Sequence, residues 1–120
     1  MPIIGRRVAT ARSYARWISE RLQEISLPGD SRTRAAAARF AIAQDHHESV
    51  ALLVSEQLCA SAFALVRIGT EAYVRGQWVR LCASDSQACV CVEAKNFEWP
   101  KFRKMVDDVE AADGCGWLRW

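Results

Sequence analysis

The sequence predicts an all-α protein, an up-and-down bundle of four or five helices in a single domain that spans residues 1–120. Apolar residues recur at alternating spacings of three and four, which is the period of a helix with one buried face. The chain has only three prolines and six glycines, so long segments run without helix-breaking residues. Hydrophobic residues make up 51% of the chain, enough for a core in a domain of this size.

The first helix is predicted over residues 6–26. Its apolar positions form one heptad seam, namely Val8, Ala11, Ala15, Ile18, Leu22 and Ile25. The helix is expected to end there because Pro28 cannot continue the hydrogen-bond ladder and Gly29 relaxes the turn.

The second helix is predicted to begin at Asp30 or Ser31, either of which is a good N-cap, and to end near Gln57. Its seam consists of Phe40, Ala43, His47, Val50 and Val54. No proline or glycine separates this helix from the next one. The small residues 59–61 are therefore the predicted break, with Ser61 as the N-cap that follows.

The third helix is predicted over residues 62–83. Its most apolar row contains several small residues and reads Leu65, Gly69, Ala72, Gly76, Val79 and Ala83. A glycine inside a helix costs about 1 kcal/mol relative to alanine. Gly69 and Gly76 therefore indicate that another helix packs closely against this row.

The C-terminal part is less regular. Residues 84–86 are predicted to end the third helix and to cap the segment that follows. Residues 87–95 fit either a short helix or, because of their Cys-Val-Cys-Val run, a strand. A loop over residues 96–100 leads into a last helix over residues 100–112, because proline is favoured at the first helical position. The apolar face of this helix is Phe102, Met105, Val106 and Val109, and residues 117–120 form a tail after two glycines.

Composition and charge exclude several classes of protein. No apolar run approaches the roughly 18–20 residues that a membrane span needs, and the composition is not that of a disordered chain. The net charge of +2 is no signature of nucleic-acid binding. Residues 1–39 hold eight arginines against three acidic residues, whereas residues 84–113 hold four basic against seven acidic residues. This asymmetry suits head-to-tail association as well as it suits an anionic ligand.

Five arginines of the first predicted helix, with Tyr14 and Trp17 between them, form a candidate contact for RNA or for a membrane surface. They are Arg6, Arg7, Arg12, Arg16 and Arg21. A solvated helix face is the favoured interpretation.

The five cysteines are an odd number without a Cys-x-x-Cys pair, and no secretory signal precedes them. They indicate buried thiols in a reducing, cytoplasmic setting, and neither a cofactor nor a metal ion is predicted. Residues 1–19 hold four arginines and no acidic residue, which is also the composition of a mitochondrial presequence. Their apolar seam continues into the long helix, which favours a structural helix.

The two histidines of the chain, His46 and His47, are adjacent. They point about 100° apart on a helix, so they do not bind one metal ion together. Arg39 precedes His46 with six residues between them. This spacing resembles, at its loosest, the Arg-x4–6-His motif of HEPN ribonucleases, in which the pair acts on an RNA phosphodiester at a dimer interface. In that motif a polar residue usually follows the arginine, whereas here Phe40 does. We therefore favour a protein without enzymatic activity over a ribonuclease.

A polar stripe follows the third predicted helix. Arg67, Glu71 and Arg75 are spaced four residues apart, so the carboxylate can pair with either arginine, and Trp78 lies next to them. A stripe that faces solvent contributes little to stability. One that faces the interior can specify the packing register or surround a polar pocket, with Tyr73 nearby.

The segment from Ser61 to Trp78 resembles the hallmark helix of a bacterial family of uncharacterised all-helical proteins, with the pattern Ser-Ala-x2-Leu-x-Arg-x3-Glu-Ala-x2-Arg-x2-Trp. A His-Glu pair in the preceding helix, here His47 and Glu48, is also similar, and the resemblance covers about residues 35–112. The family is distantly similar to HEPN-type bundles, several of which belong to phage-defence or toxin–antitoxin systems. Members continue into a further helix with a later histidine. The resemblance therefore implies a chain that is naturally short, truncated or completed by a partner.

Three functions follow as hypotheses. The first is a cytoplasmic protein that acts by protein–protein association, as a homodimer or with a partner, in a defence or toxin–antitoxin setting. The second is a HEPN-like ribonuclease that uses Arg39 with His46 or His47. The third is a regulatory bundle that binds a small ligand at Arg67, Glu71, Arg75 and Trp78.

Overall fold

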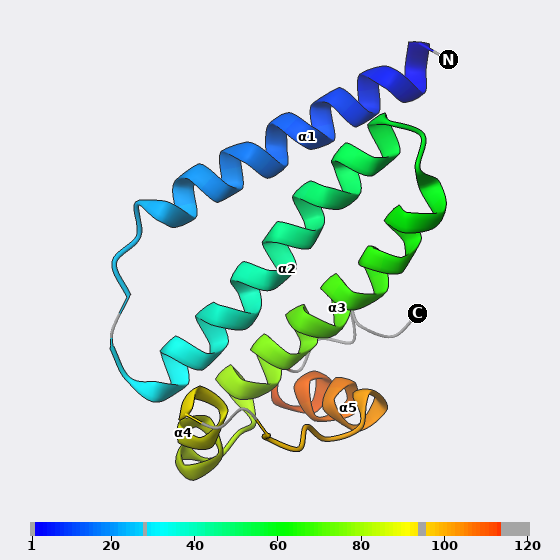
Figure 1. Cartoon of the computed structure of the whole chain (residues 1–120). Helices are drawn as coiled ribbons and strands as arrows, with labels where there is room; N and C mark the ends of the chain where they lie inside the picture. The colour runs from blue at the N-terminus through cyan, green and yellow to red at the C-terminus, as the bar shows by residue number, and fades with distance from the viewer. Residues whose placement is uncertain (1, 28, 94–95, 114–120) are drawn as a thin grey trace. The chain divides into compact units, whose positions relative to one another are not determined.

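The computed structural model describes residues 2–27, 29–93 and 96–113, with side chains from residue 5 onward. Within these ranges the chain forms five α-helices and no strand, which confirms the predicted all-α fold (Figure 1). The helices are α1 (Pro2–Gln23), α2 (Ser31–Ser55), α3 (Cys59–Leu81), α4 (Asp85–Glu93) and α5 (Phe102–Asp113). The predicted tail over residues 117–120 lies outside the described residues.

Local capping sets where two of these helices begin. The backbone N–H of Thr33 donates a hydrogen bond of 3.1 Å to Oδ2 of Asp30, which confirms Asp30 as the N-cap of α2. Hydrogen bonding by Thr33 also holds the pKa of Asp30 below its ordinary value. At α4, Ser84 and Gln87 form a reciprocal capping box, with bonds of 2.9 and 3.2 Å. This cap favours the helix, and the strand alternative for the segment is wrong.

The break between α2 and α3 differs from the prediction. α3 begins at Cys59, and the chain turns at Gln57, whose φ of 63° lies in the left-handed region. The N–H of Gln57 bonds the carbonyl of Val54, and the N–H of Leu58 bonds the carbonyl of Leu53, which is the pattern of a Schellman motif. The predicted break at residues 59–61 and the predicted N-cap Ser61 are therefore wrong. Gln57 occupies the left-handed position that glycine usually fills at the end of a helix, so no glycine in the sequence indicated where α2 ends.

The chain divides into two compact units. Unit 1 comprises residues 1–26 and 41–70, and unit 2 comprises residues 27–40 and 71–120. Because α2 and α3 each cross the boundary, both units use one part of each of these helices.

Unit 2 has a core of large side chains. Val74 and Val79 of α3 and Met105 and Val109 of α5 are at most 1% exposed. α2 approaches α3 closely here, because a Cβ added to Gly76 would lie 2.6 Å from the Phe40 ring. The predicted close packing of another helix against Gly76 is thus confirmed, and Phe40 is the side chain that fills the space.

Unit 1 is held together by small residues and polar contacts. Its buried side chains are alanines, Ala15, Ala51 and Ala62. Gln44 of α2 donates a hydrogen bond of 2.9 Å to the Ala15 carbonyl of α1, and Ser19 donates one to Glu48. The predicted seam of α1 is only partly buried, since α1 ends at Gln23 and Leu22 is 48% exposed.

Candidate functional site

Two arginines of unit 2 share one tryptophan ring. The guanidinium carbon of Arg39, on α2, lies 4.9 Å from the centroid of the Trp99 ring. The guanidinium carbon of Arg75, on α3, lies 5.0 Å from the same centroid. Both distances are within the range of a cation–π contact. We call these three residues the arginine–tryptophan cluster.

The two arginines differ in how their charges are compensated. Arg75 donates a hydrogen bond of 2.8 Å to the Glu71 carboxylate, one turn away on α3. Arg39 is half-buried and makes no hydrogen bond or ion pair with any of the described residues. Burial lowers the pKa of Arg39, and the nearby charge of Arg75 lowers it further. The cluster together with Glu71 therefore carries one positive charge in excess.

Aromatic rings hold the tryptophan in place. Phe97 meets Trp99 edge to face, with ring centroids 4.9 Å apart, and Trp78 meets it at 6.1 Å. The indole N–H of Trp78 donates a hydrogen bond of 3.3 Å to Asp108 of α5. Lys104 bonds the same carboxylate at 2.8 Å, and this bond is the main reason that the pKa of Asp108 lies below its ordinary value. Trp78 is thus a core side chain whose one polar atom is satisfied.

The predicted polar stripe is therefore divided. Glu71 and Arg75 form the expected ion pair, and Trp78 is buried beside Trp99, the ring that Arg75 contacts. Arg67 is exposed and forms no ion pair within the described residues. Trp99 lies in the predicted loop over residues 96–100, and no local pattern connects it with Arg39. The available signal was the aromatic density of the segment before Pro100, where Phe97 and Trp99 occur in four residues.

The histidines lie in unit 1, whereas Arg39 lies in unit 2. A Cβ added to Gly69 would lie 3.2 Å from the Cβ of His46, so His46 packs against α3. His47, by contrast, is exposed. The assignment of His47 to the buried seam is wrong, because α2 turns His46 rather than His47 toward Gly69. The described residues contain no group of three side chains that could hold a metal ion. Convergence of Arg39 with a histidine stays a prediction.

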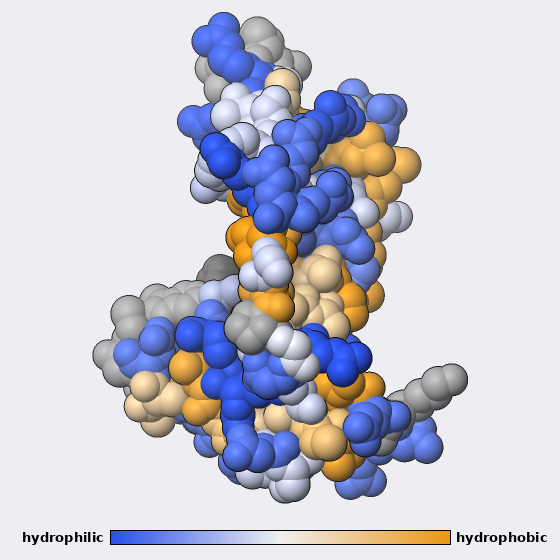
Figure 2. Space-filling model, turned by 90° about the vertical axis from the view of Figure 1, so that its left-hand side faces the viewer, coloured by the Kyte–Doolittle hydropathy of each residue, from blue (hydrophilic) through white to orange (hydrophobic). Residues whose placement is uncertain are grey.

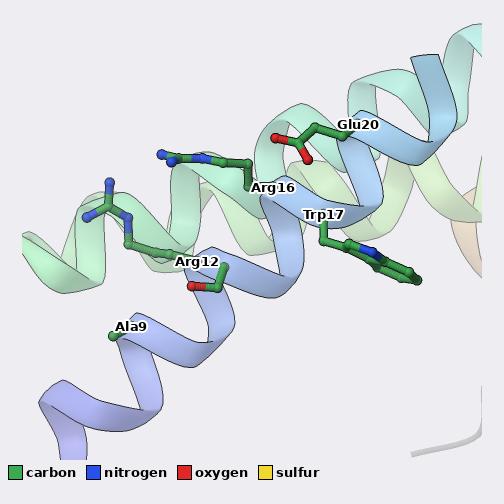
Figure 3. Close-up of a pocket in the computed structure, with 6 residues that line it drawn as sticks. Ala9, Arg12, Arg16, Trp17 and Glu20 are labelled. Atoms are coloured by element: carbon green, nitrogen blue, oxygen red, sulfur yellow. The ribbon is translucent and has the colours of Figure 1, made fainter. Parts of the chain in front are cut away.

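The arginines of α1 lie at the surface. Arg6, Arg7, Arg12, Arg16 and Arg21 are all exposed. Arg12, Arg16, Trp17 and Glu20 line a shallow depression along α1 (Figure 3). Trp17 stacks on Tyr14 at 5.9 Å and lies 5.5 Å from the guanidinium carbon of Arg21. This arrangement agrees with a solvated basic face, and the contact with RNA or a membrane stays a prediction.

Two of the described cysteines, Cys82 and Cys91, are partly buried. Burial raises the pKa of Cys82 and of Cys91, so both stay protonated near neutral pH. Cys59 is exposed, and Cys115 lies outside the described residues. None of the helices within the described ranges combines the length and the hydropathy that a membrane-spanning helix needs.

Comparison with known proteins places the chain in a family. No curated protein and no solved structure matches it. A family of unknown function, DUF6988, matches residues 40–114, which is more than half of the chain. This range agrees with the resemblance to an uncharacterised family over about residues 35–112, and it includes Glu71, Arg75 and Trp99. The chain belongs to DUF6988, a family of unknown function.

Proposed function

We propose that the protein acts by protein–protein association, most simply as a homodimer in which unit 1 supplies the contact surface. The observation that carries this proposal is the exposure of large apolar side chains in unit 1. Ten such side chains of unit 1 are at least 37% exposed, against three in unit 2, among the described residues. The ten are Tyr14, Trp17, Leu22, Ile25, Ile42, Leu52, Leu58, Phe63, Val66 and Ile68.

Exposed apolar area is costly, because burial of such area yields about 25 cal/mol per Å². Phe63 of α3 is 76% exposed, and Val66, one turn away on the same helix, is 48% exposed. Figure 2 shows orange apolar areas that lie exposed between blue hydrophilic ones. Contiguous exposed apolar side chains with a polar surround are typical of a protein–protein contact.

Charge favours a second copy of the chain as the occupant. Unit 1 carries exposed arginines on α1, among them Arg12 and Arg16, and exposed acidic side chains at Asp45 and Glu56. A contact with two-fold symmetry pairs the same two patches twice, so one copy supplies the acidic groups for the arginines of the other. A homodimer therefore uses the apolar and the charged features of unit 1 together.

Light scattering after size-exclusion chromatography tests the proposal. The chain should elute with about twice its mass of 13.5 kDa and dissociate on dilution. The double variant Phe63→Ser, Val66→Ser should be a folded monomer by circular dichroism. Phe102→Ser, which changes a 44% exposed aromatic of unit 2, serves as the matched control and should stay dimeric. A monomeric wild type at every concentration contradicts the proposal.

The bacterial defence or toxin–antitoxin setting and the cytoplasmic location rest on the family resemblance and the free thiols, and we keep them as part of the proposal. Expression of the chain in a bacterial host tests this setting. Growth arrest, or protection from phage, that Phe63→Ser abolishes supports it. Identical growth and identical phage sensitivity with and without the chain contradict it.

A ribonuclease that uses Arg39 with His46 or His47 is the second candidate. It is supported by the half-buried side chain of Arg39. The N–H donors of this guanidinium have no partners among the described residues, so they can bind a phosphodiester. Cleavage of RNA by the purified chain should disappear in Arg39→Ala and in one of the variants His46→Ala and His47→Ala. Cleavage that persists in both histidine variants contradicts this mechanism.

A further inference from the structure

We propose that the arginine–tryptophan cluster of unit 2 is a binding site for a small phosphate-type anion, inorganic phosphate or a phosphate monoester. The site differs from the predicted polar stripe, because Arg67 takes no part in it and Arg39 and Trp99 do. It depends neither on association through unit 1 nor on either histidine.

The first argument is the uncompensated charge of Arg39. Its guanidinium has five N–H donors, and none of them meets an acceptor among the described residues. A half-buried guanidinium loses part of its hydration without gaining a counter-ion, which is unfavourable. The lowered pKa of Arg39 reports this same cost, with burial as its main cause and Arg75 as the second. An anion that accepts hydrogen bonds from Arg39 removes the penalty.

The second argument is the position of Arg75. Its guanidinium lies against the same ring as that of Arg39, although like charges repel. Its Nε atom is buried and has no hydrogen-bond partner, so only one part of the fork is used by Glu71. The two guanidinium groups therefore lie against one ring, and Glu71 compensates only part of their donors and charge.

The geometry favours a tetrahedral anion over a carboxylate. A carboxylate has its two oxygens in one plane and suits a single guanidinium fork. A phosphate group presents oxygens in several directions and accepts hydrogen bonds from two guanidinium groups at once. Contact with the Trp99 ring restrains both guanidinium groups before the ligand arrives, which lowers the entropic cost of binding.

Glu71 is the natural competitor of the ligand in this site. Its side chain is 38% exposed, so it can leave Arg75 without breaking the core. The substitution Glu71→Gln removes the negative charge and keeps a side chain of the same size. It should therefore strengthen binding, whereas a merely structural ion pair gives no reason for a gain in affinity.

Isothermal titration calorimetry with inorganic phosphate and with phenyl phosphate, on the full chain at low ionic strength, tests the proposal. Both arginine variants, Arg39→Gln and Arg75→Gln, should weaken binding by about tenfold or more. Glu71→Gln should tighten it several-fold, and His46→Ala should leave it unchanged. The matched control is Arg34→Gln, which removes an exposed arginine from the same helix in the same unit and should change the affinity less than twofold.

The choice of probes distinguishes a phosphate monoester from free phosphate, and either of them from a carboxylate. Tighter binding of phenyl phosphate than of inorganic phosphate assigns the site to monoesters, and the reverse assigns it to the free ion. Acetate that binds as tightly as phosphate overturns the proposal, as does an equal loss of affinity in Arg34→Gln and Arg39→Gln. Absence of phosphate binding at millimolar concentration also overturns it. Should Arg39→Gln fail to fold, Arg39→Lys keeps the charge without the fork and should lose most of the affinity.

Discussion

The two compact units use the same two helices, α2 and α3, but they bury very different side chains. Unit 2 encloses valine, methionine and tryptophan side chains, whereas the buried side chains of unit 1 are alanines. Unit 2 gains its core because α4, α5 and the aromatic segment around Trp99 pack on its part of α3. In unit 1, α1 is the one further helix beside the parts of α2 and α3, among the described residues. Unit 2 therefore encloses a core of large apolar side chains, while unit 1 leaves most of its large apolar side chains exposed among the described residues.

The largest expected effect tests whether stability resides in unit 2. Met105→Ala removes a side chain that is 1% exposed and should lower the free energy of unfolding by about 2–5 kcal/mol. Leu52→Ala in unit 1 changes a side chain that is 44% exposed and should cost about 1 kcal/mol or less in the monomer. Urea unfolding followed by circular dichroism measures both. Equal costs would show that the two units are equally well packed.

The next effect compares the two helix contacts at glycine. Gly76→Ala places a Cβ 2.6 Å from the Phe40 ring and should lower the free energy of unfolding by about 1–2 kcal/mol, since the overpacking outweighs the gain in helix propensity. Gly69→Ala in unit 1 meets His46 at 3.2 Å and should be near neutral. A thermal melt measures each variant.

The double variant Gly76→Ala, Phe40→Leu provides the control for this contact. The smaller side chain makes room for the added Cβ, so Gly76→Ala should cost less beside leucine than beside phenylalanine. An unchanged cost would place the strain of Gly76→Ala elsewhere than at Phe40.

A smaller gain in stability is expected at the turn between α2 and α3. Gln57 has a φ of 63°, which costs a residue with a Cβ about 1 kcal/mol, so Gln57→Gly should raise the free energy of unfolding by about 0.5–1 kcal/mol. The neighbouring variant Glu56→Gly changes an ordinary backbone position and should not stabilise the protein. Chemical unfolding that shows the opposite order would contradict the Schellman assignment.

The smallest effect concerns acid stability in unit 2. The pKa of Asp108 is lowered in the folded protein, chiefly by the hydrogen bond from Lys104. The ionised carboxylate therefore contributes stability above its ordinary pKa, and this contribution is lost as the pH falls below about 4. Because the pair is partly exposed, this contribution is expected to be small.

Denaturant unfolding between pH 2 and pH 7 checks this effect. Asp108→Asn should flatten the acid-side decrease in stability relative to wild type. Asp107→Asn, on the exposed side of the same helix, should leave more of the decrease in place. A steeper decrease in Asp108→Asn than in wild type would reverse the sign and refute the assignment.

Much of the secondary structure followed from local patterns. The N-cap candidates Asp30 and Ser31 predicted where α2 begins, and the small row of α3 predicted a close helix contact that Gly76 confirms. The polar pair Glu71 and Arg75 was likewise visible in its spacing of four residues. These features depend on residues within one or two helical turns, so the sequence alone contains them.

Contacts between distant segments could not be read in this way. The left-handed turn at Gln57 contains no glycine, so the sequence does not indicate it. The turn is identified by the φ of Gln57 and by the backbone hydrogen bonds that the carbonyls of Leu53 and Val54 accept. The stacking of Arg39 and Arg75 on Trp99 joins three segments that lie far apart in the chain. Periodicity indicates which face of a helix is buried, but only the packed structure decides which ring meets which guanidinium, because that depends on how the segments are brought together.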